Sequence, residues 1–133
     1  MAESIPDAAR HLFEKPNFAH VATLSPDGTP QVTPVWIDID GDTVIFNTAR
    51  GREKDKNLQR DPRVGISIHD QENPYESVSV QGQAVELTEE GADEHIDAMA
   101  QQYLGEEAYP FRQEGEVRVI VRIEADSVFH GGG

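Results

Sequence analysis

The feature that most constrains this chain is an alternation of apolar and polar residues between positions 18 and 47, interrupted by two short turns. A period of two predicts β-strands with one buried face. Asp27-Gly28 and Asp40-Gly41-Asp42 mark the turns, because Gly accepts the positive φ that tight hairpins require. Pro34 lies inside the middle strand and cannot donate a ladder hydrogen bond, so we expect that strand at a sheet edge. The three predicted strands are 18–24, 31–37 and 43–47.

The rest of the chain predicts further strands and three helices. Strand patterns recur at 63–69, 77–87 and 117–123, with a short last strand at 127–130. Helical patterns cover about 4–15, 48–60 and 88–103. The helices are too few and too irregularly placed for a parallel βαβ sheet, so we expect a mainly β (α+β) fold, a small antiparallel barrel with peripheral helices. The acidic residues around the second turn are expected only to solvate it: Asp38, Asp40 and Asp42.

Length and composition exclude several classes of protein. A chain of 133 residues has room for one core, so residues 1–133 are expected to form a single domain. The absence of Cys excludes disulfides, thiolate zinc sites and a Cys nucleophile. A net charge of −14 argues against nucleic acid or a membrane as a partner. The first residues lack the features of a signal peptide and no apolar stretch could span a membrane, so a cytoplasmic location is expected.

A basic segment stands out in this acidic chain. Six of the eleven Lys and Arg residues lie between positions 50 and 63. The segment follows a strand, contains Gly51 for close backbone approach, and enters a helix whose N-terminal amides favour anions, which is an arrangement suited to a phosphate. If the helix begins near Gly51, Arg50, Lys54 and Asn57 share one face. A solvated basic helix paired with the abundant acids explains the same charges, and both interpretations stay open here.

Other patterns carry less chemistry. Thr33-Pro34-Val35-Trp36 contains the only Trp of the chain and leads toward the basic helix, so it could place a flat aromatic ligand there or provide an ordinary core side chain. None of the five His residues forms a pair with zinc spacing, and no metal site is expected. The nucleophile, dinucleotide and P-loop motifs are also absent from the sequence.

Several runs together resemble a known superfamily. They are 22–36 (ATLSPDGTPQVTPVW), 46–54 (FNTARGREK), 57–64 (NLQRDPRV) and 73–75 (NPY). In combination they are similar to the pyridoxamine 5′-phosphate oxidase-like superfamily, and within it to the small oxidoreductases that use the deazaflavin coenzyme F-420. The resemblance extends over about residues 8–130. It implies a six-stranded antiparallel split β-barrel over about residues 17–130, preceded by the helix at 4–15, and a homodimer with cofactor clefts at the subunit interface.

The resemblance also implies roles for individual residues. Arg52 and Lys54 would hold the cofactor phosphate, with Arg50 in the same basic segment. Thr48 and Asn57 would support it. The strand residues Thr33, Pro34, Val35 and Trp36 would line the ring system, and Asn47 would lie at its edge. Tyr75, Phe129 and His130 are weaker candidates to reach the site from the partner subunit.

Three functions follow as hypotheses. The first is a reductase that passes a hydride from reduced F-420 to a small electrophilic molecule such as an enone, quinone or tetrapyrrole. The second is an FMN-dependent oxidoreductase of the same fold, and the third is a non-catalytic protein that binds a flavin, tetrapyrrole or fatty acid. No catalytic acid can be assigned, because no residue in these runs is an evident proton donor. A site for pyridoxine phosphate cannot be matched either.

Overall fold

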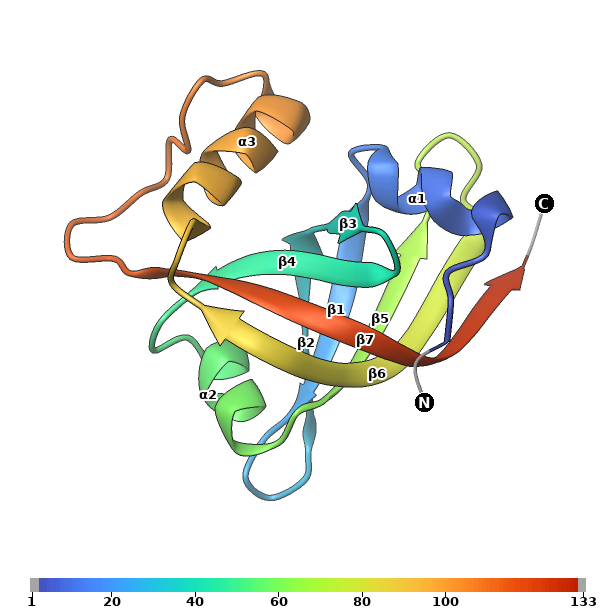
Figure 1. Cartoon of the computed structure of the whole chain (residues 1–133), viewed down its shortest axis with the longest axis horizontal. Helices are drawn as coiled ribbons and strands as arrows, with labels where there is room; N and C mark the ends of the chain where they lie inside the picture. The colour runs from blue at the N-terminus through green and yellow to red at the C-terminus, as the bar shows by residue number, and fades with distance from the viewer. Residues whose placement is uncertain (1–2, 132–133) are drawn as a thin grey trace.

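The computed structural model describes residues 3–131. Seven strands form one sheet in the order β2-β1-β5-β6-β7-β4-β3, and all neighbouring pairs are antiparallel. The sheet curls around its own inner face, which confirms the expected split β-barrel (Figure 1). The strands are β1 (Phe18–Leu24), β2 (Pro30–Trp36), β3 (Asp38–Asp40), β4 (Thr43–Ala49), β5 (Arg63–His69), β6 (Ser77–Thr88) and β7 (Arg118–Gly131).

Two differences from the expected strands have local causes. β7 is a single strand of 14 residues, where the sequence predicted two shorter ones. Its pairing with β6 shifts register next to Gly82, and a Cβ at that glycine would clash with the carbonyl oxygen of Glu124. This β-bulge breaks the alternation without ending the strand. The seventh strand is the three-residue β3, which is too short to leave a periodic signal.

The helices are shorter than their sequence patterns. The N-terminal one is a 3₁₀ turn, η1 (Asp7–Ala9), followed by α1 (Arg10–Glu14), so the expected helix over 4–15 is wrong at both ends. α2 (Glu53–Arg60) begins two residues after Gly51, with Arg52 at its N-cap. α3 (Ala92–Leu104) begins after the expected residue 88, because Thr88 is still part of β6. Within the described residues no helix is both long and apolar enough to cross a bilayer.

The core lies inside the curled sheet. Inward side chains of the strands, such as Phe46, Ile68 and Val80, are almost completely buried there. Leu12 and Phe13 of α1 join the same cluster and close one end of the barrel. α2 and α3 lie on the opposite side, where β4 ends and β7 begins (Figure 1). Pro34 is in the edge strand β2, as its missing N–H predicted.

The acidic residues near the second turn do more than solvate it, which corrects the expectation for two of them. Asp42 accepts a hydrogen bond of 3.0 Å from the Ile5 amide and thereby fixes the N-terminal segment. Asp38 accepts hydrogen bonds from the Ile39 amide and from His95 of α3. The sequence could not show the second of these contacts, because its partner is 57 residues away.

Candidate functional site

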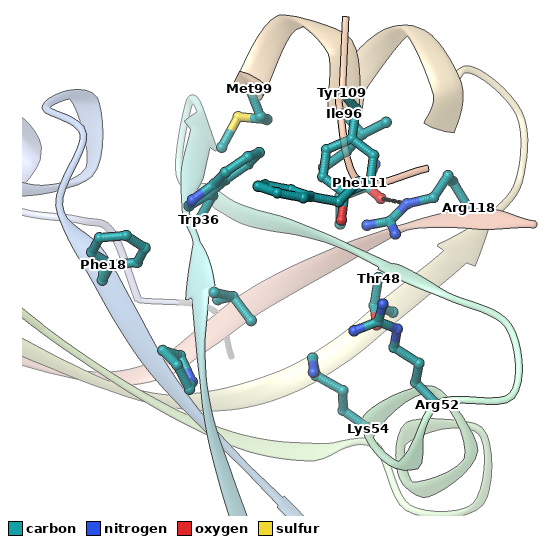
Figure 2. A pocket seen from close by; sticks show the side chains of 13 residues that line it. Phe18, Trp36, Thr48, Arg52, Lys54, Ile96, Met99, Tyr109, Phe111 and Arg118 are labelled. Carbon is teal, nitrogen blue, oxygen red and sulfur yellow. Dashed lines mark hydrogen bonds between the residues drawn. The ribbon is translucent and has the colours of Figure 1, made fainter. Parts of the chain in front are cut away.

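A cleft of about 180 Å³ lies between α2 and the segment that joins α3 to β7 (Figure 2). Cationic side chains from the α2 side line one part of it, and aromatic side chains from the α3 side line the other. The lining residues are Phe18, Pro34, Val35, Trp36, Asn47, Thr48, Arg52, Lys54, Ile96, Met99, Tyr109, Phe111 and Arg118.

The cationic part is built on the start of α2. Lys54 lies in the first turn of the helix and is only 9% exposed. Within residues 3–131 its ammonium group has no hydrogen-bond or ion-pair partner. Burial lowers the pKa of Lys54 below its ordinary value of 10.5, and the nearby charges of Arg52 and Arg118 lower it further. A buried, unpaired cation costs free energy unless an anion joins it.

A second polar group in the cleft also lacks a partner. The Oγ1 atom of Thr48 is buried and forms no hydrogen bond with any described residue. It lies near the side of the cleft where Arg52 and Lys54 point (Figure 2). The first amides of α2 have no acceptor inside the helix and carry its positive dipole end. These groups together could hold an anion such as a phosphate.

Arg118 is a third cation at the cleft, and it is held in place. Its Nε donates to Asn47 Oδ1 at 2.8 Å and its Nη1 donates to Glu116 Oε1 at 3.2 Å. The guanidinium lies 5.0 Å from the ring centre of Tyr109. Glu116 also lies 3.9 Å from Arg52, so this carboxylate faces two of the three cations of the cleft. The local charge is therefore +2 before a ligand binds.

A hydrogen-bonded network fixes the Asn47 amide at the edge of the cleft. Its Nδ2 donates to the Ala92 carbonyl at 3.0 Å and lies 3.1 Å from His95 Nδ1. Because Oδ1 accepts from Arg118, the Nδ2 group must be the donor, and His95 Nδ1 must accept. His95 therefore carries its proton on Nε2 and donates it to Asp38, 3.1 Å away.

The charge state of Asp38 suits this network. Burial raises its pKa, but the hydrogen bonds from His95 and the Ile39 amide and the nearby charges outweigh burial, so the pKa falls below 3.8. The carboxylate is thus ionised at neutral pH and holds the imidazole in one orientation. Asn47 then presents a fixed acceptor to Arg118.

The aromatic part of the cleft centres on Trp36. Its ring stacks on Tyr103 with 5.2 Å between centroids, and Tyr109 meets it edge-on at 5.9 Å. Phe111 contacts Tyr109 in turn at 5.7 Å. The Tyr103 hydroxyl accepts from the Ile37 amide and donates to the Asn17 carbonyl, and burial raises its pKa to about 12. These contacts hold a rigid aromatic wall that suits a flat ring system.

Comparison with known proteins agrees with this geometry. Residues 5–130 match the family described as pyridoxamine 5′-phosphate oxidase. The chain belongs to this family. Its members are flavin-binding oxidoreductases of the split-barrel fold. The search of curated proteins gave no match.

Solved structures of other proteins show how well the fold is shared. An F-420 reductase superposes with a TM-score of 0.84 at 27% identity, over 94% of this chain and 98% of its own. A conserved hypothetical protein from Mycobacterium tuberculosis gives 0.74 at 26% identity, over 96% of this chain and 85% of its own. HupZ from Group A Streptococcus gives a TM-score of 0.68 at 22% identity, over 97% of this chain and 95% of its own. At this identity the likeness shows the fold alone.

Most of the predicted site residues meet in this cleft. Seven of them line it: Pro34, Val35, Trp36, Asn47, Thr48, Arg52 and Lys54. Three others are not among its lining residues. Arg50 pairs with Asp55 and Glu89. Asn57 is fully buried and donates to Thr23 Oγ1, which ties α2 to β1. Thr33 faces the barrel interior, and its hydroxyl has no partner among the described residues.

The three weaker candidates also lie outside the cleft of this single chain. Tyr75 is 81% exposed in the connection between β5 and β6. Phe129 lies on the outer face of the sheet near the end of β7, opposite Ser79. His130 forms a contact of 3.0 Å with Glu76, at a different part of the barrel.

Sequence reasoning missed the other half of the cleft. Tyr109, Phe111 and Arg118 come from the segment after α3 and from the start of β7, which gave only turn and strand signals. Ile96 and Met99 were assigned to the apolar face of a helix, which is correct, but that face also borders the cleft. Two aromatic residues inside the turn-rich stretch 105–115 were the one available signal.

Proposed function

We propose that the protein is an F-420-dependent oxidoreductase that reduces a small electrophilic molecule such as an enone, a quinone or a tetrapyrrole. The observation that carries the proposal is Lys54, a buried ammonium without a partner in the described chain, beside the unpaired Thr48 hydroxyl. The resemblance to an F-420 reductase at 27% identity over 94% of the chain supports the choice of cofactor.

The cationic part of the cleft suits the phosphate of a deazaflavin, and the aromatic part suits its ring system. Lys54, Arg52 and the first amides of α2 would bind the phosphate, and Thr48 would donate its hydroxyl to the same group. Trp36 and Tyr109 would line the ring system. The aromatic wall would exclude water from the reacting face.

When bound, the reduced deazaflavin supplies a hydride to the electrophilic carbon of the substrate, and a proton then completes the reduction. The chain's own contribution is to bind, to orient and to keep the site dry. Arg118, fixed by Asn47, would stabilise negative charge that develops on a substrate oxygen. No carboxylic acid or imidazole is among the lining residues, so the proton would come from solvent or from the Tyr109 phenol.

FMN is the second candidate, and the local charge favours it. The cationic part carries +2, because Glu116 offsets one of three cations. A phosphate monoester such as that of FMN carries about −1.5 to −2 at neutral pH, which matches this charge closely. The phosphodiester of F-420 carries less charge at the same position.

The experiment is a parallel titration of cofactor-free protein with F-420 and with FMN, followed by ligand fluorescence. Tight binding of F-420 and oxidation of its reduced form by at least one acceptor would support the proposal. Preference for FMN would move the protein to the flavin-dependent enzymes. Saturable binding with no turnover of any acceptor would favour the non-catalytic binding protein. Binding of neither cofactor would refute both enzymatic hypotheses and leave only a protein that binds a tetrapyrrole or a fatty acid.

We further propose that the protein is a homodimer whose subunits meet over the outer face of the sheet. Residues that pair across neighbouring strands lie on the same face of the sheet. On the outer face of β2, β1, β5, β6 and β7, twelve positions linked by this pairing carry no Asp, Glu, Lys or Arg. In a chain with 27% charged residues such a face is unusual. Its members are Phe18, His20, Ala22, Val32, Pro34, Trp36, Gly65, Ser67, Ser79, Gln81, Ser127 and Phe129.

This uncharged face is continuous with the cleft. Phe18, Pro34 and Trp36 belong to both, so a second copy on the face would also enclose the cofactor. Phe129 and Val32 are 68% and 58% exposed there. Apolar side chains at this exposure are stabilised when a partner covers them.

Light scattering coupled to size exclusion tests the dimer. Phe129→Glu is expected to convert it to monomers and to weaken cofactor binding. Val85→Glu is the matched control, since Val85 is 53% exposed but lies outside the twelve positions of the face. A wild-type monomer at micromolar concentration would refute the proposed assembly and leave the cofactor assignment untouched.

A further inference from the structure

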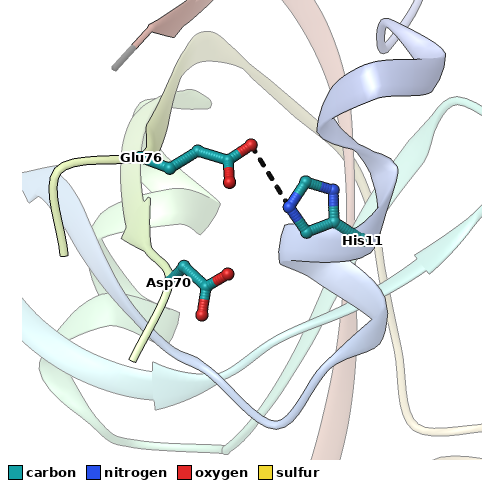
Figure 3. A group of neighbouring side chains, drawn as sticks. All are labelled: His11, Asp70 and Glu76. Carbon is teal, nitrogen blue, oxygen red and sulfur yellow. Dashed lines mark ion pairs between the residues drawn. The ribbon is translucent and has the colours of Figure 1, made fainter. Parts of the chain in front are cut away.

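A cluster of histidines and carboxylates lies far from the cofactor cleft, where α1, the β5–β6 connection and the end of β7 meet (Figure 3). The Oε2 atom of Glu76 lies 3.2 Å from His11 Nε2 and 3.0 Å from His130 Nε2. The ligand atoms of His11, Asp70 and Glu76 all lie within 4.8 Å of one another. None of these residues lines the cleft.

The spacing of His11 and Glu76 matches an edge of a zinc tetrahedron. Zn²⁺ binds imidazole nitrogen and carboxylate oxygen at about 2.0–2.2 Å, which puts neighbouring ligand atoms about 3.3 Å apart. His11 Nε2 lies 3.2 Å from Glu76 Oε2, and Asp70 offers a third ligand atom within 4.8 Å of both residues. Small movements of these three side chains would let them share a metal ion, while His130 holds Glu76 by a hydrogen bond.

The charge of the surroundings favours a divalent cation. With neutral imidazoles, the carboxylates of Asp70, Glu72 and Glu76 face one ammonium group, that of Lys15, so the local charge is −2. Lys15 Nζ contacts both oxygens of Asp70, at 3.0 and 3.1 Å, and Glu72 at 2.9 Å. One divalent ion would neutralise the cluster.

We propose that His11, Asp70 and Glu76 bind a divalent transition metal such as Zn²⁺ once Asp70 leaves Lys15, with His130 positioning Glu76 and a water molecule as the fourth ligand. One imidazole with two carboxylates forms a donor set that Zn²⁺ and its neighbours in the first row bind. His11 is 41% exposed at its side chain, which gives the ion a path from solvent. The ion would join α1 to the β5–β6 connection and stabilise their contact.

The test uses chelator-treated full-length protein and Zn²⁺ alone as the probe, in isothermal titration calorimetry and thermal unfolding. One ion per chain and an increase in Tm are expected, because a ligand that binds only the folded state stabilises it. Co²⁺ in place of Zn²⁺ should give the visible absorption of a tetrahedral site. Absence of binding at micromolar Zn²⁺ would overturn the proposal.

His11→Gln separates a metal site from a cluster that is only hydrogen-bonded. A Gln amide can still donate to Glu76, so folding is preserved, but it is a poor ligand for Zn²⁺. This variant is expected to weaken Zn²⁺ binding at least about tenfold, whereas His130→Gln keeps a donor to Glu76 and should weaken it less. His20→Ala removes an exposed imidazole elsewhere and should leave Zn²⁺ affinity unchanged. Unchanged Zn²⁺ affinity in His11→Gln would refute the site.

Lys15→Met tests Asp70 as a ligand in the opposite direction. It frees Asp70 and removes a positive charge near the cluster, so Zn²⁺ should bind more tightly and Tm in excess Zn²⁺ should rise. A purely hydrogen-bonded cluster predicts only the lost ion pair and no gain in metal affinity. Unchanged or weaker Zn²⁺ binding in this variant would exclude Asp70 as a ligand.

Discussion

Lys54→Met should make the ligand-free protein more stable while it weakens cofactor binding. The Lys54 ammonium is buried and unpaired within the described residues, and it lies close to Arg52 and Arg118. Met fills a similar volume without the charge. Removing an uncompensated buried charge in this way should raise the free energy of unfolding by about 1–2 kcal/mol at neutral pH.

The same change removes a charged donor to the phosphate. Hydrogen bonds to charged groups contribute about 1.5–3 kcal/mol, so the cofactor dissociation constant should increase about 10- to 150-fold. Stability and binding therefore move in opposite directions. A residue that serves only the fold would move neither in this way.

The pH dependence gives a further check, because the pKa of Lys54 is lowered from 10.5 in the folded state. Below the lowered pKa the ammonium is charged in both states, and its full cost to folding is present. As the pH rises through the lowered pKa toward 10.5, the folded protein loses this proton first and the cost disappears. The stability difference between Lys54→Met and wild type should shrink over the same range.

Urea unfolding at several pH values and fluorescence titration with the cofactor measure both effects. Lys56→Met is the matched control: it lies on the same helix, is 57% exposed and pairs with Glu53. Its substitution should change stability by no more than about 0.5 kcal/mol and should leave the dissociation constant unchanged. A less stable Lys54→Met protein, or one that binds the cofactor as the wild type does, would refute the assignment of Lys54.

Three further predictions concern the fold and the network. Gly82→Ala should lower the free energy of unfolding by about 2–3 kcal/mol, because its Cβ would meet backbone at the bulge. Gly65→Ala, where the nearest atom to the new Cβ is 3.8 Å away, should cost less than half of that. Equal losses in urea unfolding would contradict the bulge. Since Tyr103 has a pKa of about 12, the wild type should lose about 1 kcal/mol of stability between pH 10 and 11 as the unfolded phenol ionises first, and Tyr103→Phe should not show this loss in unfolding followed by circular dichroism. Asp38→Asn should weaken cofactor binding about five- to tenfold. An amide at this position reverses the His95 tautomer, so that His95 Nδ1–H and the Asn47 Nδ2 group, both donors, face each other. An unchanged dissociation constant in fluorescence titrations would exclude the network from the site.

The strands were predictable because one physical rule governs them locally. A curled sheet buries one face, so residues such as Val64, Ile66 and Ile68 alternate visibly along the chain. Pro34 even showed which strand is at the edge. The bulge at Gly82 was not predictable, since it depends on a carbonyl group of another strand 42 positions away in the sequence.

The site was predictable only where it is local. Arg52 and Lys54 follow from a basic helix start after a strand. Arg118 reaches the same cleft because β7 pairs with β4, and Tyr109 reaches it from the segment tied to α3 by the hydrogen bond of its amide to Asp97. No pattern near either residue in the sequence indicates a ligand. The pairing order of the sheet, not the local sequence, decides which residues meet.

The structure also separates the two interpretations of the basic segment, and each is correct for different residues. Four of its six cations pair with acids of this chain: Arg50 with Asp55 and Glu89, Arg52 with Glu116, Lys56 with Glu53, and Arg63 with Asp61. Lys54 differs, because its ammonium has no partner within residues 3–131 and faces the cleft. An acidic chain can pair its solvated cations in this way and leave uncompensated charge only where an anionic ligand binds. High salt should therefore weaken cofactor binding, because salt screens the attraction between the cleft and an anionic ligand. The free energy of unfolding of the ligand-free protein should rise or stay unchanged, because salt also screens the self-repulsion of a chain with net charge −14.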